Sequence, residues 1–279
     1  MFKHVRLLRF LSPLLLLAVL LLVFPSGVKV IFAAASHLSS APSLVGPKKH
    51  YLALGDSLAF GYQLDKDYFH GYARDYLAEL KGHGVRDMFD IGCPGETSIT
   101  LIKGGCPVLP KFVPSQLSVA LAYLKVHPAT VSPVTLDIGA NDMLNDINLT
   151  SCVINMSQYQ RDLAVLDTSL RQVILPKLYA ALTVRGRTTG DLLIMNYYDP
   201  YQNICPAQLS FTLTLNQHLA GDVQGYGTIV NVFDAFGGVN VPNAHICSYT
   251  WMCHSPADIH PTDRGYQVIA NTFHATAGY

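Results

Sequence analysis

The sequence predicts an α/β fold, a three-layer α/β/α sandwich in which helices cover both faces of a parallel sheet of about five strands. Two observations support this prediction. From His50 onward, short apolar runs alternate with longer segments of helical periodicity, an order typical of a parallel sheet covered on both faces. No internal repeat and no second block of different composition indicates another large domain.

Five short apolar runs are the predicted strands, at residues 51–54, 88–91, 134–138, 192–197 and 228–233. Helices are predicted from the three- and four-residue spacing of apolar side chains, at 70–82, 115–126, 157–183, 208–222 and 262–275. Pro176 should kink the third of these helices, because proline removes a backbone donor. Thr262 stands where the last helix begins and is a favourable N-cap residue.

The N-terminus has the layout of a secretory signal peptide. Basic residues precede an apolar run that reaches Phe24, and three alanines ending at Ala35 suit a cleavage site. The alternative is an uncleaved membrane anchor, although the run is shorter than the roughly 20 apolar residues that a spanning helix needs. The predicted organisation is a signal peptide (1–35), a flexible lead (36–47) and one large catalytic α/β domain (48–279).

The charge balance narrows the possible partners. Lys plus Arg and Asp plus Glu number 19 each, and charged residues make up 14% of the chain, so neither nucleic acid nor an acidic polymer is expected to bind. An uncharged small molecule or lipid is the better expectation. We expect a secreted, extracellular monomer that has no membrane span after cleavage and uses no metal or cofactor.

All six cysteines follow the predicted signal peptide, at Cys93, Cys106, Cys152, Cys205, Cys247 and Cys253. An even number in an exported chain predicts disulfides. Short loops favour the pairs 93–106 and 247–253, which leaves 152–205. A metal site built from Cys247, Cys253, His254 and His260 is the alternative, but an oxidising compartment and the cysteine spacing both argue against it.

Polar or glycine-rich segments follow three predicted strands, and another precedes the last helix. Ligands of open parallel sheets bind at the carboxyl ends of the strands, so these distant segments can share one site. Ser57 follows the first strand, and a serine hydroxyl needs both a base and oxyanion donors to act as a nucleophile. The segments are Gly55-Asp-Ser-Leu58, Cys93-Pro-Gly-Glu-Thr97, Gly139-Ala-Asn-Asp142 and Asp258-Ile-His-Pro-Thr262.

In this order the four segments resemble the sequence blocks of the GDSL (SGNH) hydrolase family, in its secreted esterase/lipase type. The resemblance implies a flavodoxin-like SGNH hydrolase fold and a role for each matching residue. Ser57 would be the nucleophile, and His260 the general base and later the general acid. The backbone N–H groups of Ser57 and Gly95 and the side-chain amide of Asn141 would form the oxyanion hole.

One departure from the family pattern concerns the acid that orients the histidine. The family commonly has Asp three residues before the histidine, whereas this sequence has Ala257 there and Asp258 two residues before His260. Either an extended loop brings the Asp258 carboxylate to the ring, or a main-chain carbonyl such as that of Ala257 orients it. The residues favour Asp258. A second departure is Asp90, where the family commonly has Asn.

The predicted function is hydrolysis of carboxylic esters, with an acyl-enzyme on Ser57. No Gly-x-Ser-x-Gly segment indicates an ordinary α/β-hydrolase. Deacetylation of a polysaccharide and a catalytically silent cell-surface binding module are the alternatives. Several aromatic residues could contact an acyl chain or merely pack elsewhere: Phe60, Tyr62, Tyr68, Phe69, Tyr249 and Trp251.

Overall fold

The computed structural model describes residues 43–108 and 114–279. The predicted signal peptide and the first part of the predicted lead lie outside the described residues. At the end of that lead, the backbone N–H groups of Val45 and Gly46 donate to the Asp191 carboxylate, at 2.6 and 2.8 Å. The chain is therefore attached to the domain from residue 45 onward.

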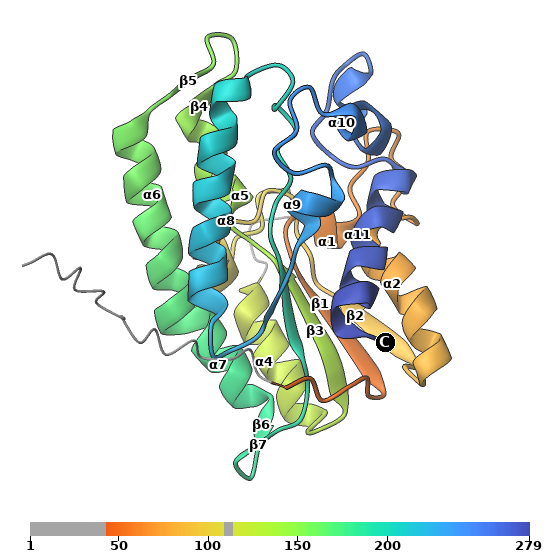
Figure 1. Cartoon of the computed structure of the whole chain (residues 1–279). Helices are drawn as coiled ribbons and strands as arrows, with labels where there is room; N and C mark the ends of the chain where they lie inside the picture. The colour runs from red at the N-terminus through yellow and green to blue at the C-terminus, as the bar shows by residue number, and fades with distance from the viewer. Residues whose placement is uncertain (1–42, 109–113) are drawn as a thin grey trace, which may run out of the picture. The chain divides into compact units, whose positions relative to one another are not determined.

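A five-stranded parallel sheet forms the centre of the domain (Figure 1). Its order is β2 (Asp87–Asp90), β1 (His50–Gly55), β3 (Val131–Asp137), β8 (Leu192–Met195) and β9 (Thr228–Val230). All five predicted strands are present, and every pairing in this sheet is parallel. The predicted fold class is confirmed.

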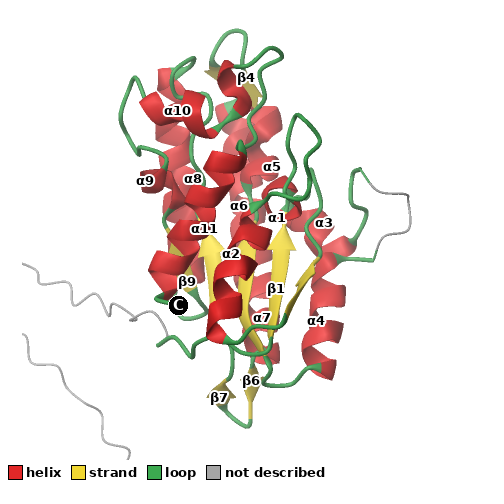
Figure 2. Cartoon of the chain, turned by 90° about the vertical axis from the view of Figure 1, so that its right-hand side faces the viewer, coloured by secondary structure: helices red, strands yellow, loops and turns green. Residues whose placement is uncertain are grey.

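Helices cover both faces of the sheet (Figures 1 and 2). On one face lie α2 (Tyr72–Leu80) and α11 (Asp263–Ala277). The other face carries α4 (Gln116–Val126), α6 (Met156–Ser169), α7 (Leu175–Ala181) and α8 (Leu209–Val223). None of the described helices is long and apolar enough to cross a membrane.

The long helix predicted at 157–183 is interrupted just before Pro176. A five-residue π-helix, η3 (Leu170–Ile174), joins α6 to α7, and Pro176 lies in the first turn of α7. Since proline has no N–H to donate to the preceding turn, a wider turn at this point accommodates the missing bond. As predicted, the Thr262 hydroxyl caps α11, where it accepts from the N–H of Gly265.

Short elements connect the layers. The short α-helices are α1 (Ser57–Phe60), α3 (Ser98–Lys103), α5 (Ala140–Met143), α9 (Val232–Ala235) and α10 (Ala244–Tyr249). The 3-10 turns are η1 (Lys81–His83), η2 (Leu144–Asp146), η4 (Pro206–Gln208) and η5 (Trp251–Cys253). Two hairpins complete the described elements, β4 (Ile147–Asn148) with β5 (Val153–Ile154) and β6 (Thr183–Val184) with β7 (Arg187–Thr188).

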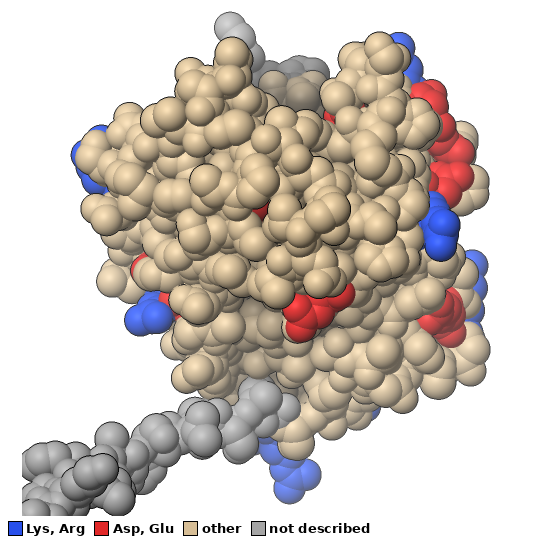
Figure 3. All heavy atoms as spheres, turned by 45° about the horizontal axis from the view of Figure 1, so that its top comes forward, with Lys and Arg blue, Asp and Glu red and all other residues tan. Residues whose placement is uncertain are grey.

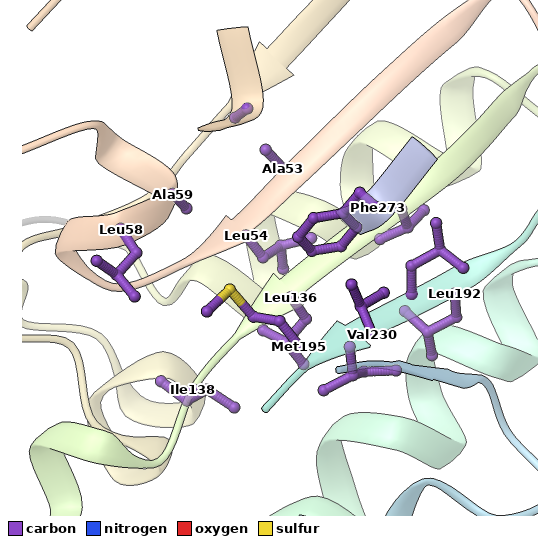
Figure 4. Close-up of a cluster of buried hydrophobic side chains, with 14 of the residues drawn as sticks. Ala53, Leu54, Leu58, Ala59, Leu136, Ile138, Leu192, Met195, Val230 and Phe273 are labelled. Carbon is purple, nitrogen blue, oxygen red and sulfur yellow. The ribbon is translucent and has the colours of Figure 1, made fainter. Parts of the chain in front are cut away.

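The apolar core joins the sheet to its helices. Side chains of neighbouring strands, among them Leu54, Leu136, Met195 and Val230, lie together beside Phe273 of α11 (Figure 4). All five are fully buried. Burying a side chain of this kind contributes about 1.5–3 kcal/mol, so the core keeps the strand ends in fixed positions.

The strand order determines where a site can form. β1 connects to β2 at one edge, whereas β3 and the later strands extend the sheet from the other side of β1. Such a reversal opens a crevice at the carboxyl ends of β1 and β3. Ser57 begins α1 directly after β1, and Asn141 lies in α5 directly after β3.

Candidate active site

Ser57 lies in a sharp turn between β1 and α1. Gly55 has φ +142°, and a Cβ at this position would lie 2.4 Å from the Asp137 carboxyl group. Only glycine is tolerated there. The side chain of Asp56 caps α1 by accepting the N–H of Leu58 at 2.9 Å. Ser57 is the first residue of this helix and is buried except for 8% of its surface.

Two buried carboxyl groups hold this turn in place. The Asp137 carboxyl accepts the N–H of Asp56 at 2.9 Å, the N–H of Ala59 at 3.3 Å and the hydroxyl of Tyr72 at 2.5 Å. Asp56 in turn accepts the Tyr197 hydroxyl at 3.0 Å. Burial, together with the charge of Asp56, raises the pKa of Asp137 well above its usual range. Burial raises the pKa of Asp56 as well, and of the two carboxyl groups Asp137 is the one whose protonated form is favoured more strongly.

The ring of His260 lies between Ser57 and Asp258. Its Nε2 is 2.8 Å from the Ser57 hydroxyl oxygen, and its Nδ1 is 2.5 Å from Asp258 Oδ1. Although burial opposes it, hydrogen bonds from the His260 ring and backbone lower the pKa of Asp258. The three side chains thus form one hydrogen-bonded chain that ends at the serine hydroxyl.

Asp258 lies only two residues before His260, and a local turn, not extended backbone, brings its carboxylate to the ring. The Asp258 carboxylate also accepts the backbone N–H of His260 at 2.8 Å, an Asx-type bond that folds the carboxylate back toward the ring. Among the described residues, no hydrogen bond joins the Ala257 carbonyl to the ring. The structure therefore places the Asp258 carboxylate on the ring, as in the first predicted arrangement, but through a turn and not through the expected extended loop.

Backbone hydrogen bonds, a contact between two rings and a disulfide position the loop that carries His260. The N–H of Trp251 donates to the His260 carbonyl at 3.0 Å, and the N–H of Thr262 donates to the Tyr249 carbonyl at 2.9 Å. The Tyr62 ring packs against the imidazole, with 4.5 Å between ring centroids. The disulfide between Cys247 and Cys253 closes the preceding segment.

Two of the three predicted oxyanion donors, Gly95 and Asn141, lie in segments that are bonded to each other. Asn141 Nδ2 donates to the Glu96 carbonyl at 3.0 Å, which occupies one of its two hydrogens and leaves the other for a ligand. Next to it, the Asp142 carboxylate accepts the backbone N–H and the hydroxyl of Ser98, at 2.9 and 2.6 Å. Gly95, with φ +82°, immediately precedes Glu96 and so lies on the loop that Asn141 contacts.

A pocket opens beside Ser57, with an interior of about 100 Å³. A single water needs roughly 10–15 Å³ by the same measure, so the pocket has room for an organic group. Ser57, Asn141 and His260 all line it, whereas Gly95 is not among its described lining residues. Its apolar lining comprises Leu58, Ala140, Met143, Leu144, Ile147, Tyr159, Tyr197, Tyr198, Pro200, Tyr201, Phe211, Leu215 and Ile259.

The aromatic residues expected to contact an acyl chain do not line this pocket. Tyr62 packs on His260 instead, Phe60 and Tyr68 pack on each other, and Phe69 is 84% exposed. Of the two possibilities given for these residues, acyl contact or packing elsewhere, the structure has the second. The pocket draws its aromatic side chains from α6, from the segment after β8 and from α8.

The cysteines pair as predicted, 93 with 106, 152 with 205, and 247 with 253. Cys247 and Cys253 therefore offer no thiolate to a metal. Outside the pocket, two groups of described side chains bring ligand-type atoms within 4.8 Å of one another. One is Cys93, Glu96 and Cys106, whose two cysteines are joined in a disulfide, and the other is Asp67, His70 and Asp263. The Asp67 carboxylate is bonded to the His70 ring at 2.8 Å.

Uncharged residues dominate the surface around the strand ends. Figure 3 turns this end of the domain toward the viewer, and Lys, Arg, Asp and Glu lie mainly toward the edges of the view. Such a surface offers no cluster of charge that would attract a polyanion or polycation.

Comparison with solved structures shows the same fold in several esterases and lipases. The lipase Lip_vut3 from a goat rumen metagenome is 16% identical over 82% of this chain and 97% of its own, with a TM-score of 0.58. Axe2, an acetylxylan esterase from Geobacillus stearothermophilus, is 14% identical over 85% of this chain and 97% of its own, with a TM-score of 0.53. A putative GDSL-like lipase from Parabacteroides merdae is 17% identical over 85% and 99%, also with a TM-score of 0.53.

A search of curated proteins found no match. Residues 53–268, which run from before Ser57 to beyond His260, match the family model described as the GDSL-like lipase/acylhydrolase family. This range covers well over half of the chain and carries the serine, the asparagine and the histidine that line the pocket. The chain belongs to the GDSL-like lipase/acylhydrolase family and is a carboxylic ester hydrolase.

Proposed function

We propose that the protein is a secreted esterase that hydrolyses carboxylic esters of short to medium acyl chains through an acyl-enzyme on Ser57. The observation that carries this proposal is the hydrogen-bonded chain Asp258–His260–Ser57 at the edge of a largely apolar pocket. Three disulfides in a chain whose sequence predicts a signal peptide support an extracellular location.

Acylation begins with the serine hydroxyl. As Ser57 Oγ attacks the ester carbonyl carbon, its proton passes to His260 Nε2, and the carbonyl π pair moves onto oxygen. Asp258 accepts the Nδ1–H and stabilises the imidazolium that forms. The free hydrogen of the Asn141 amide, with the backbone N–H groups of Ser57 and Gly95, stabilises the oxyanion.

Collapse of this intermediate breaks the bond to the alcohol oxygen, which takes the proton from His260, and leaves the acyl group on Ser57. A water molecule then repeats the sequence. His260 takes its proton, the hydroxide oxygen adds to the acyl carbon, and the Ser57–acyl bond breaks as the proton returns to Oγ. The carboxylic acid is released and the free serine is restored.

Labelling by a fluorophosphonate probe tests the nucleophile directly. The native protein should be labelled, and the substitution Ser57→Ala should abolish labelling and lower kcat by several orders of magnitude. Ser98, buried and bonded to Asp142, provides the control, since Ser98→Ala should still be labelled. A native protein that is never labelled would instead be a silent binding module.

Substitution of the side-chain oxyanion donor tests the second half of the mechanism. Asn141→Ala should lower kcat about 100- to 1,000-fold, because one donor to the developing charge is lost. Its KM should change much less.

Activity on ethyl and nitrophenyl esters of different chain length, measured beside acetylated xylan, separates an esterase from a polysaccharide deacetylase. Cleavage of the polysaccharide alone would refute the substrate part of the proposal and leave the mechanism in place.

A further inference from the structure

One wall of the pocket beside Ser57 is polar. Most of the lining is apolar, but Asp199, Gln208 and Thr212 also line it. They come from two neighbouring segments, the loop after β8 and the turn η4 with the start of α8. A pocket made only for an alkyl chain would gain nothing from these side chains.

Gln208 is buried without hydrogen-bond partners. The residue is 2% exposed, and neither Oε1 nor Nε2 has a partner among the described residues. Exchanging the positions of the amide oxygen and nitrogen does not supply a hydrogen-bond partner, because both atoms are unpaired. A buried polar group left unpaired costs about 1–3 kcal/mol, so such a group in a pocket lining indicates a ligand that completes its bonds.

The other buried glutamines have at least one paired amide atom: Gln63 leaves only Oε1 unpaired and donates from Nε2 to Asp263 at 2.7 Å. The amide of Gln116 bonds to the backbone of Gly55 at both ends, at 3.0 and 2.7 Å. Gln202 likewise uses both amide atoms, donating to the Gly238 carbonyl at 2.8 Å and accepting from Asn243 at 3.2 Å. Among the described glutamines buried to this degree, only Gln208 has both amide atoms unpaired.

The neighbouring carboxyl group of Asp199 has one unpaired oxygen. Its Oδ1 accepts the backbone N–H of Tyr201 at 2.9 Å, whereas Oδ2 has no partner at hydrogen-bonding distance. Burial raises the pKa of Asp199 to about 6, although the Tyr201 N–H and the nearby Thr212 hydroxyl oppose the rise. The wall therefore offers an acceptor on Asp199 and both a donor and an acceptor on Gln208.

This pocket is the one that receives the acyl group. It touches Ser57, Asn141 and His260 together, the groups around the attacked carbonyl. A second, more open hollow is lined by His260 and Asp258 but by neither Ser57 nor Asn141. Since His260 delivers the proton to the leaving alcohol, that hollow is the place for the leaving group.

We propose that the preferred substrates are esters of hydroxylated carboxylic acids, whose acyl hydroxyl binds Gln208 and Asp199. This inference rests on the esterase activity proposed above. A hydroxyl donates one hydrogen bond and accepts others, so it can donate to Asp199 Oδ2 while it accepts from Gln208 Nε2. An unsubstituted alkyl chain in the same place leaves both side chains unpaired.

Matched pairs of ethyl esters test the proposal, for example hexanoate against 6-hydroxyhexanoate and octanoate against 8-hydroxyoctanoate, with kcat/KM measured by titration of the released acid. The native protein should prefer the hydroxylated member at one chain length or more, by about 10- to 100-fold. Gln208→Met keeps the size of the side chain but removes its donor and acceptor. In this variant the preference, taken as the ratio of the two kcat/KM values, should fall to about threefold or less.

Gln160→Met is the matched control, because Gln160 is exposed on α6 and does not line this pocket; its preference should equal that of the native protein. Equal or lower activity on the hydroxylated ester at every length overturns the inference, as does a preference that survives in Gln208→Met. Should Gln208→Met not fold, the preference of the native protein decides alone. If the native protein neither cleaves any ester nor reacts with a fluorophosphonate, the esterase proposal itself fails.

Discussion

The two residues that share a proton at this site are held in different ways. Ser57 rests on a buried network in which Asp137 and Asp56 bind backbone N–H groups and tyrosine hydroxyls from distant parts of the chain. His260 is bonded to Asp258 and Trp251 within one loop, and only the Tyr62 ring and the Tyr198 hydroxyl, which donates to the Ile259 carbonyl at 2.7 Å, reach this loop from farther along the chain. The first arrangement belongs to the folding of the whole domain, whereas the second can be altered with little effect on the core.

The largest expected effect is on kcat, from substitution of the residue that orients His260. Asp258→Ala should lower kcat about 100- to 10,000-fold, because nothing else then fixes the ring or stabilises the imidazolium. The melting temperature should change little, since Asp258 lies in a partly exposed loop. Asp258→Asn, which keeps the size but not the charge, should recover only part of the activity. Near-native turnover in Asp258→Ala would mean that a main-chain carbonyl can orient His260 instead.

On the serine side, the corresponding substitution should affect folding first. Asp137→Ala leaves the N–H groups of Asp56 and Ala59 and the Tyr72 hydroxyl unpaired in the core. We expect the free energy of unfolding to fall by about 3–5 kcal/mol. Asp137→Asn resembles the protonated acid and should cost much less. Equal losses in the two variants, measured by urea unfolding at pH 7, would contradict a protonated Asp137.

The smallest effect concerns Asp90, a half-buried carboxyl group at the end of β2 that lies outside both networks. Burial raises its pKa to about 6, against the opposing effects of the Gly92 N–H and the charge of Arg74. Because this value exceeds the unfolded pKa of about 3.9, folding takes up a proton between about pH 4 and 6. The contribution of Asp90 to stability is therefore lost as the pH rises through that window.

Asparagine cannot titrate and still offers an oxygen to Gly92. Asp90→Asn should therefore raise the free energy of unfolding by about 1–3 kcal/mol at pH 7, and the gain should shrink toward zero below about pH 4. Urea unfolding at the two pH values measures the difference. A gain of equal size at both would show that titration of Asp90 is not its cause.

Periodicity predicted the sheet and the main helices, and the resemblance to the GDSL family selected Ser57, Asn141 and His260, which line one pocket. They could not reveal the network beneath Ser57, because Asp137 ends an apolar strand and Tyr197 follows another, so both read as core positions. One usable signal was available, since an aspartate at the buried end of β3 needs partners. Spacing along the chain also could not identify the aromatic lining of the pocket, because packing between distant segments determines it.

The short elements were missed for a related reason. Helices such as α3 and α10 have six residues each, too few to show a helical period. Gln208 lies in such a segment, the 3-10 turn η4. Whether its amide finds a hydrogen-bond partner depends on tertiary packing and cannot be read from the sequence.

The hydrogen bond between Ser57 and His260 spans 203 residues of sequence. A ribosome that has made the serine must therefore add most of the domain before the base exists, and the nucleophile remains unactivated throughout that time. The serine therefore cannot be activated until nearly the whole domain has been synthesised.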